Sequence, residues 1–162
     1  TRFTDKMPLN YLYCGIIARA FPRARILHMT RHPIATCHAA YKTLFSQGYP
    51  WSYDLRETAE YFIGYANLMS HWKRTCAASI LDVEYESLVS NPESESKRIF
   101  EFCGLRWNSG VTDIAHRSGS STTASASQAR RPISSSSVDL WKHYSQELEV
   151  VQIRLNADGI AT

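Results

Sequence analysis

Two short apolar runs, separated by a long stretch of helical pattern, constrain the fold of this chain more than any other feature. Residues 25–30 and 79–85 have the length and the aliphatic content of strands. The residues between them carry helical periodicity that is interrupted at Gly48 and Pro50. Because strands joined by a helical crossover pair in parallel, the sequence predicts an α/β fold built on a parallel sheet.

Helical patterns predict the other elements, which cover residues 9–20, 33–46, 54–76, 91–104 and 138–158. Two of these segments have strong start signals. Asp54 followed by Glu57 resembles a capping box, and Asn91 followed by Pro92 places a capping residue before a proline. Gly104 is the predicted end of the helix that starts after Asn91.

The second predicted strand has a polar face. Its alternation places Leu81, Val83 and Tyr85 on one face and Asp82 and Glu84 on the other. Parallel sheets are normally covered on both faces, and an acidic face fits poorly with such a strand. We retain the strand prediction together with this conflict.

The length of 162 residues fits one domain. Two strands do not make a stable sheet by themselves, so we expect further strands from residues that precede Thr1. The first residue is threonine rather than methionine, which agrees with this expectation. We therefore interpret residues 1–162 as the C-terminal part of a single domain.

Composition matters mainly for what it excludes. Apolar residues are 44% of the chain and charged residues 20%, which is typical of a globular domain. No apolar run approaches the roughly 20 residues of a membrane span. The net charge of +3 is mild and indicates no nucleic-acid partner. The cysteines lie in apolar contexts without a Cys-x-x-Cys pair, which favours reduced core residues and a cytoplasmic location; they are Cys14, Cys37, Cys76 and Cys103.

Arg31 is the first candidate for binding chemistry. It ends the first predicted strand, directly before a helix start at Pro33, and open parallel sheets bind ligands at the carboxyl ends of their strands. A guanidinium beside free backbone N–H groups and a positive helix end favours a phosphate. From position alone, pairing with a carboxylate remains the alternative. Tyr85, at the end of the second strand, is from position alone more often a packed aromatic residue.

Several other chemistries find no support in the sequence. Neither Gly-x-x-x-x-Gly-Lys-Ser/Thr nor Gly-x-Gly-x-x-Gly is present, so the chain contains no complete nucleotide cradle. His28 and His32 flank the strand end, but their spacing does not bring two metal ligands together, and no metal site is predicted. No serine lies in a nucleophile-elbow context.

Six stretches follow a known order and spacing over nearly the whole chain. They are Asp5-Lys6-Met7-Pro8, residues 21–33, residues 80–93, Phe102-Cys103-Gly104-Leu105, residues 123–133, and Trp141. Together they resemble the sulfotransferases that use 3′-phosphoadenosine-5′-phosphosulfate. The resemblance is greatest to the bacterial branch that is often fused to tetratricopeptide repeats and is related to protein-tyrosine sulfotransferases. It implies a P-loop-type, three-layer α/β/α fold with a parallel sheet, of which this chain forms the C-terminal portion.

The resemblance implies roles for three residues in the first 85. Lys6 matches the lysine that contacts the bridging oxygen of the sulfuryl donor and stabilises the charge that develops there. Arg31 matches the arginine that holds the 3′-phosphate, which agrees with the argument from the strand end. Tyr85 matches a tyrosine that lines the cofactor site.

Four more matches fall in the Ser/Thr-rich segment 118–137, for which composition alone leaves a flexible linker equally open. Ser125 matches the serine near the transferring group in the tyrosine-sulfating relatives. Gln128, Arg130 and Arg131 belong to the loop that closes over the cofactor in the family. The arginine pair favours such a lid over a linker.

The sequence also departs from the family pattern. Ala39 stands where the family usually has a serine that bonds the 3′-phosphate, and Leu140 where it usually has a basic residue, with Lys142 the nearest substitute. Pro8 occupies the position of the histidine base of cytosolic small-molecule members. We expect the loop that grips the 5′-phosphosulfate, and the base of the tyrosine-sulfating relatives, before Thr1.

The sequence thus predicts an enzyme, a sulfotransferase that moves a sulfuryl group from 3′-phosphoadenosine-5′-phosphosulfate to a hydroxyl or amine, without a metal. Protein tyrosine is one candidate acceptor, and the 162-residue chain alone is expected to be inactive. The alternative is a catalytically degenerate module of the same fold that binds a nucleotide or partner, which Ala39 and Leu140 favour. A third hypothesis, a nucleic-acid-binding protein, is supported only by the mild excess of basic over acidic residues. The sequence indicates neither the acceptor nor the oligomeric state.

Overall fold

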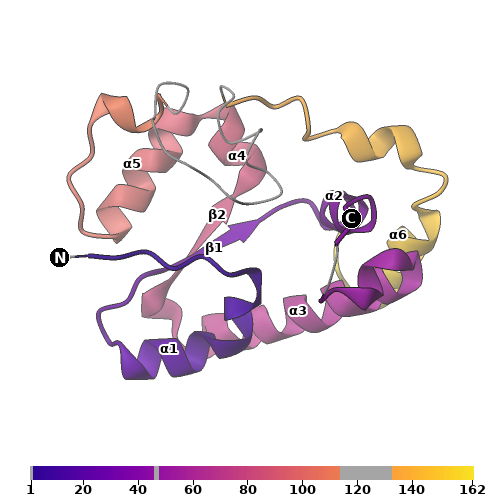
Figure 1. Ribbon diagram of the computed structural model, residues 1–162, viewed down its shortest axis with the longest axis horizontal. Coiled ribbons are helices and arrows are strands. Elements are labelled where there is room, and N and C mark those ends of the chain that lie inside the picture. Colours follow the sequence, from indigo (N-terminus) through magenta and orange to yellow (C-terminus); the bar gives the residue numbers. More distant parts are fainter. Residues whose placement is uncertain (1, 46–47, 114–132) are drawn as a thin grey trace.

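The computed structural model describes residues 2–45, 48–113 and 133–162. Its helices are α1 (Cys14–Ala20), α2 (Pro33–Tyr41), α3 (Leu55–Thr75), α4 (Tyr85–Ser90), α5 (Pro92–Phe102) and α6 (Glu149–Ala157). Its strands are β1 (Ile26–Thr30) and β2 (Ile80–Glu84), and its 3₁₀ turns are η1 (Pro8–Tyr13), η2 (Pro50–Tyr53), η3 (Ala77–Ser79), η4 (Ser109–Val111) and η5 (Leu140–Tyr144). Figure 1 shows α1 and α3 below the strands in that view and α4 and α5 above them. Within these ranges, no helix is both long and apolar enough to cross a membrane.

The two strands form the parallel pair that the sequence predicts. Ile26 lies opposite Ile80, His28 opposite Asp82, and α2 and α3 form the connection between the strands. Among the described residues the sheet consists of β1 and β2. The predicted α/β unit with a helical crossover is therefore confirmed.

The long helix α3 organises the core. Its start agrees with the prediction, because the carboxylate of Asp54 accepts hydrogen bonds from the backbone N–H groups of Arg56 and Glu57. Side chains from α2, α3 and the α6 region pack together in one buried cluster: Ile34, Cys37, Ala59, Ile63, Leu148, Val151 and Leu155. This packing holds α2, and with it the carboxyl end of β1, against α3.

Three predicted helices are shorter or less regular than the sequence pattern indicates. The first is a 3₁₀ turn up to Tyr13 and becomes α-helical at Cys14; the Tyr11 carbonyl there accepts a hydrogen bond from Trp72 Nε1 at 2.8 Å. The helix after β1 ends at Tyr41 instead of near residue 46, and Leu44, beyond its end, is 87% exposed. The last pattern divides into η5 and α6.

The helix α5 begins and ends at the predicted positions. Pro92 is its first residue, although the side chain of Asn91 makes no capping hydrogen bond. Gly104 follows the helix with φ +60°, a conformation that favours glycine. The backbone N–H of Leu105 donates to the carbonyl of Phe100 at 2.8 Å, which closes the helix end.

The two faces of β1 differ in exposure. Alternate residues Leu27 and Met29 are 40% and 50% exposed, whereas Ile26, His28 and Thr30 are half-buried. One apolar face of the strand is thus open to solvent. This open face is consistent with, but does not test, the expectation of further strands before Thr1.

The cysteines are free thiols, although only two of them lie in the core. Cys14 and Cys37 are buried, whereas Cys76 and Cys103 are half-buried. Burial raises the pKa of the Cys37 thiol to about 12, so this thiol is protonated and unreactive at neutral pH.

Candidate functional site

Arg31, Tyr85 and Ser137 meet at the carboxyl end of the sheet. The Arg31 guanidinium carbon lies 4.9 Å from the centroid of the Tyr85 ring, and Arg31 Nη2 donates a hydrogen bond to the Ser137 carbonyl at 2.5 Å. The Tyr85 hydroxyl and Ser137 Oγ are 2.7 Å apart. Two residues that the sequence analysis placed in one site, 54 positions apart, are therefore in contact in the structure.

Tyr85 reaches this contact from a position different from the predicted one. It is the first residue of α4, and Glu84, the last residue of β2, is the N-cap of that helix. The chain therefore turns into a helix directly at the strand end. This turn brings the phenol ring of Tyr85 over Arg31.

His32 and Trp141 complete the described part of the site. The His32 ring stacks on the Trp141 ring with centroids 4.6 Å apart, and the His32 backbone N–H donates to Glu86 Oε1 at 3.0 Å. Burial lowers the pKa of the His32 imidazole, although the nearby Glu86 carboxylate opposes this effect. From the sequence, His32 is considered only as a possible metal ligand, a role that its spacing does not support, and it is not predicted to lie in this site.

Two nitrogen atoms in the site are buried and have no hydrogen-bond partner among the described residues. They are Arg31 Nε and His32 Nδ1, on neighbouring residues at the start of α2. A buried nitrogen without a partner is costly, and a guanidinium Nε–H can bond only an acceptor. The site is therefore suited to a bound anion that accepts from Arg31, where helix α2 also presents its positive end.

Lys6 shares no hydrogen bond or ion pair with this cluster in the part of the chain that the structure describes. Its side chain is exposed, in the extended segment before η1, and among the described residues it makes no ion pair. No described contact joins Lys6 to Arg31 or Tyr85. Ser125, Gln128, Arg130 and Arg131 lie outside the described residues.

The positions that depart from the family pattern lie close to the site. Ala39 is on α2 and lines a cavity beside the strand end. Leu140 begins η5 and is 39% exposed, and Lys142, two residues later, forms an ion pair with Asp139 at 2.7 Å. Lys142 is thus engaged locally and does not contact Arg31 directly.

A second polar cluster joins both strands to α3, and sequence analysis missed it. His28 Nδ1 lies 2.7 Å from Asp82 Oδ1, the His28 Nε2 atom is hydrogen-bonded to the Tyr65 hydroxyl, and Lys73 Nζ lies 2.9 Å from Asp82 Oδ2. These contacts resolve the conflict noted for the second strand, because its acidic face has partners. The acidic residue at position 82 is the one sequence feature that could have indicated this cluster. Its partner His28 can be identified only once the strand register is known.

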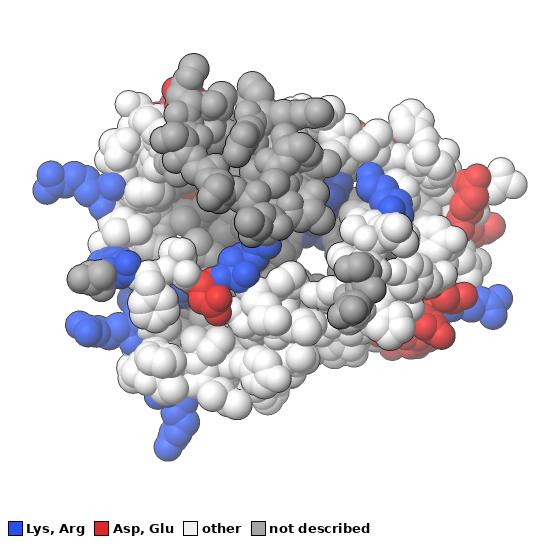
Figure 2. Space-filling view, in the orientation of Figure 1, with Lys and Arg blue, Asp and Glu red and all other residues white. Residues whose placement is uncertain are grey.

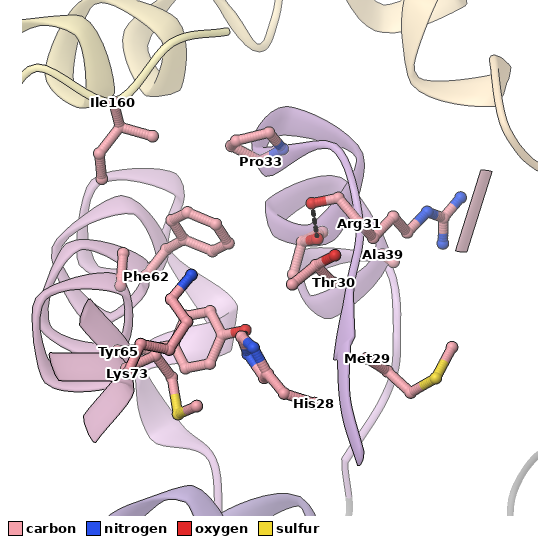
Figure 3. A pocket seen from close by; sticks show the side chains of 13 residues that line it. His28, Met29, Thr30, Arg31, Pro33, Ala39, Phe62, Tyr65, Lys73 and Ile160 are labelled. Atoms are coloured by element: carbon pink, nitrogen blue, oxygen red, sulfur yellow. Dashed lines mark hydrogen bonds between the residues drawn. The ribbon is translucent and has the colours of Figure 1, made fainter. Parts of the chain in front are cut away.

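The cluster borders a cavity of about 380 Å³ between β1, α2 and α3. Figure 3 shows His28, Tyr65 and Lys73 together on one side of this cavity, with Phe62 beside them, whereas the Arg31 side chain points away from it. Apolar residues make up much of the rest of its lining, among them Ala66, Met69 and Ile160.

Charge on the molecule is dispersed on the face shown in Figure 2. Lys and Arg side chains lie at several separate places around that face, and acidic side chains lie mainly at its right-hand end, with others near its middle and upper edge. Among the described residues, no group of three or more His, Cys, Asp or Glu side chains is arranged to hold a metal ion.

Two parallel strands joined by the helices α2 and α3 define an α/β protein, and Arg31 lies at the carboxyl end of β1, where open parallel sheets bind ligands. The sequence model of the sulfotransferase family matches residues 1–109. The chain therefore belongs to the sulfotransferase family.

One curated relative is similar to this chain along most of its length. A protein of Aquifex aeolicus (strain VF5), described as uncharacterized, is 29% identical over 153 residues, which are 93% of this chain. The chain spans about a fifth of the length of that relative, since the match covers 20% of it.

Proposed function

We propose that this chain contributes to a sulfotransferase that moves a sulfuryl group from 3′-phosphoadenosine-5′-phosphosulfate to a hydroxyl or amine. The observation that carries the proposal is the Arg31 guanidinium at the end of β1, packed on Tyr85 and retaining a buried Nε–H without a partner. A phosphate oxygen is a suitable acceptor for this donor, and family membership makes the 3′-phosphate of the donor the natural candidate.

The remaining roles extend this proposal to the whole site. Tyr85 lines the nucleotide site, and Lys6 stabilises charge on the oxygen that leaves the sulfur. Ser125, with Gln128, Arg130 and Arg131, supplies contacts from the segment that follows η4. Sulfuryl transfer, like phosphoryl transfer, depends mainly on positioning and on charge stabilisation, which these residue types provide.

The proposal also concerns the domain to which these residues belong and its possible acceptor. Residues 1–162 are the C-terminal part of one three-layer, P-loop-type domain, and the loop for the 5′-phosphosulfate precedes them. The branch fused to tetratricopeptide repeats and related to protein-tyrosine sulfotransferases is the nearest resemblance, which makes protein tyrosine one acceptor to test. The open apolar face at Leu27 and Met29 supports a larger domain.

A second candidate function is a nucleotide-binding module without catalysis. Ala39 supports it, because this position on α2 cannot donate a hydroxyl hydrogen bond to the 3′-phosphate. Calorimetry with 3′-phosphoadenosine-5′-phosphate and a transfer assay with labelled donor, both on the natural protein that contains this chain, separate the two functions. We expect binding together with transfer; binding without transfer would support the module, and no binding would contradict both.

A further inference from the structure

The cluster of His28, Asp82, Tyr65 and Lys73 is an ordered chain of ionisable groups. It draws on three elements, β1, β2 and α3, and the His28 side chain is only 10% exposed. The His28 ring also packs against the Tyr65 ring, with centroids 5.6 Å apart. None of these residues has a role in the site around Arg31.

The direction of the hydrogen bonds in this cluster follows from the charge of Asp82. Burial alone would raise the pKa of the Asp82 carboxyl, but hydrogen bonds from Lys73 and His28 outweigh it and hold that pKa below its ordinary value. The carboxylate can only accept, so His28 Nδ1–H donates to it. The Nε2 atom of a neutral His28 is then an acceptor, and the Tyr65 O–H donates to it.

In this order of hydrogen bonds, the His28 imidazole is a base whose ring is oriented by a carboxylate. The carboxylate of Asp82 fixes the tautomer of His28 and would stabilise its protonated form. The ammonium of Lys73, 2.9 Å from the second oxygen, keeps that carboxylate in place. Burial raises the pKa of Tyr65 to about 12, so its hydroxyl carries a proton at neutral pH and can pass one on only while receiving another.

The cavity beside the cluster has the size and lining of a small-molecule pocket. Its volume of about 380 Å³ lies within the usual range for ligand sites. Phe62, Ala66 and Met69 line it with apolar surface, and Tyr65 and His28 supply polar atoms on the side seen in Figure 3. Such a cavity suits a compound with an apolar body and one hydroxyl group. Residues Thr30 and Arg31 also line it, so it adjoins the strand end of the proposed donor site.

We propose that this cavity binds the acceptor, a small apolar alcohol or phenol, and that Tyr65 and His28 together accept the proton of its hydroxyl group. The proposal rests on the proposed function. In the step, the acceptor proton passes to the Tyr65 oxygen as the Tyr65 proton passes to His28 Nε2. The acceptor oxygen forms its bond to sulfur while the bond between sulfur and the donor's bridging oxygen breaks, and the electron pair leaves with the phosphate. His28 ends as an imidazolium beside Asp82.

The simplest rival to this proposal is a purely structural role, in which the four side chains only tie β1, β2 and α3 together.

The test uses the natural protein that contains this chain, with 4-nitrophenol as acceptor and labelled donor. Tyr65→Phe retains the ring and removes the hydroxyl, and we expect it to lower kcat by about 10²-fold or more, the lower end for proton-transfer catalysis. Binding of 3′-phosphoadenosine-5′-phosphate should not change. Tyr61→Phe is the matched control, because Tyr61 lies one turn earlier on α3, bonds Tyr11 at 2.8 Å and does not line the cavity.

Substitution of His28 helps to separate catalysis from structure. His28 faces Asp82 from β2 and Tyr65 and Lys73 from α3, and His28→Gln, which removes the proposed base, should lose most of the wild-type kcat. If Tyr65→Phe and Tyr61→Phe lower the melting temperature equally and leave kcat unchanged, the network is structural and the proposal is wrong.

A binding measurement covers the case in which no transfer is seen. We expect 4-nitrophenol to bind in calorimetry and Ala66→Phe, which fills the cavity, to abolish this binding. If 4-nitrophenol does not bind, or if the donor binds but no sulfuryl group is transferred to 4-nitrophenol, this inference is wrong and the proposed function still stands. Failure of 3′-phosphoadenosine-5′-phosphate to bind would instead overturn the proposed function.

Discussion

Arg31 shows how one residue can be predicted from local sequence while its surroundings cannot. Its place between a strand and a helix start is visible in the sequence, and the structure places it there. Its contact with the Ser137 carbonyl joins residues 106 positions apart and follows from no local pattern. The contact that Arg31 makes in the absence of a ligand therefore depends on the tertiary structure.

Removing the Arg31 side chain should weaken nucleotide binding. We expect Arg31→Ala to reduce the affinity for 3′-phosphoadenosine-5′-phosphate by about 2–4 kcal/mol, the scale for loss of a buried charged contact. Isothermal calorimetry on the natural protein measures this loss. Arg19→Ala, an exposed arginine in the last turn of α1, is the control and should bind normally. Equal affinities of Arg31→Ala and wild type would exclude the phosphate role.

Lys6 should affect turnover more than binding. If its ammonium stabilises charge on the leaving oxygen, the interaction grows in the transition state, so Lys6→Ala lowers kcat much more than donor affinity. Steady-state kinetics and calorimetry on the same variant provide both values. Losses of equal size would show that Lys6 is an ordinary phosphate contact.

At the scale of elements, the hydrogen-bonded cluster between β1, β2 and α3 explains why an acidic residue is tolerated in a parallel strand. The strand assignments followed from apolar content and the helices from periodicity, both of which are local. The register that sets His28 opposite Asp82 depends on how whole elements pack. Helix ends were also less predictable, since α2 ends at Tyr41 instead of near residue 46.

This cluster predicts a loss of stability in acid. The pKa of Asp82 is lower in the folded protein than its ordinary value. Its contribution to stability is therefore present above the unfolded pKa of about 3.9 and is lost as pH falls through the folded pKa. Urea unfolding should show a smaller difference between pH 7 and pH 3 in Asp82→Asn than in wild type. Asp139→Asn, which alters an exposed ion pair with Lys142, should behave like wild type; an unchanged difference in Asp82→Asn would contradict the prediction.

At the scale of the molecule, the described sheet is small for the helices around it. It has two strands in the described ranges, and Leu27 and Met29 expose one face of β1. Small two-stranded sheets are marginal, and exposed apolar faces promote association. The proposed phosphate site at Arg31 therefore lies at the end of a strand that is open to solvent on one face.

If a longer domain carries residues 1–162, as proposed, these residues produced alone should be less stable than that domain. We expect a broad thermal transition, binding of a hydrophobic dye, and no transfer from labelled donor, because the proposed loop that grips the donor is not among them and donor positioning contributes a large factor. Calorimetric melting and the transfer assay on both proteins provide the comparison. A chain that melts cooperatively and matches the longer protein in activity would contradict this prediction and locate the whole active site in these residues.

Local sequence patterns were sufficient to predict the α/β class, the parallel strand pair, most helix positions and the arginine at the strand end. These depend on periodicity, capping residues and chain order, which are properties of neighbouring residues. Only the tertiary structure decided that Ser137 bonds Arg31, that His32 stacks on Trp141, and that His28 joins Asp82 to Tyr65. These contacts depend on strand register and on how η5 and α3 pack against the sheet, and long-range packing leaves no local signature in the sequence.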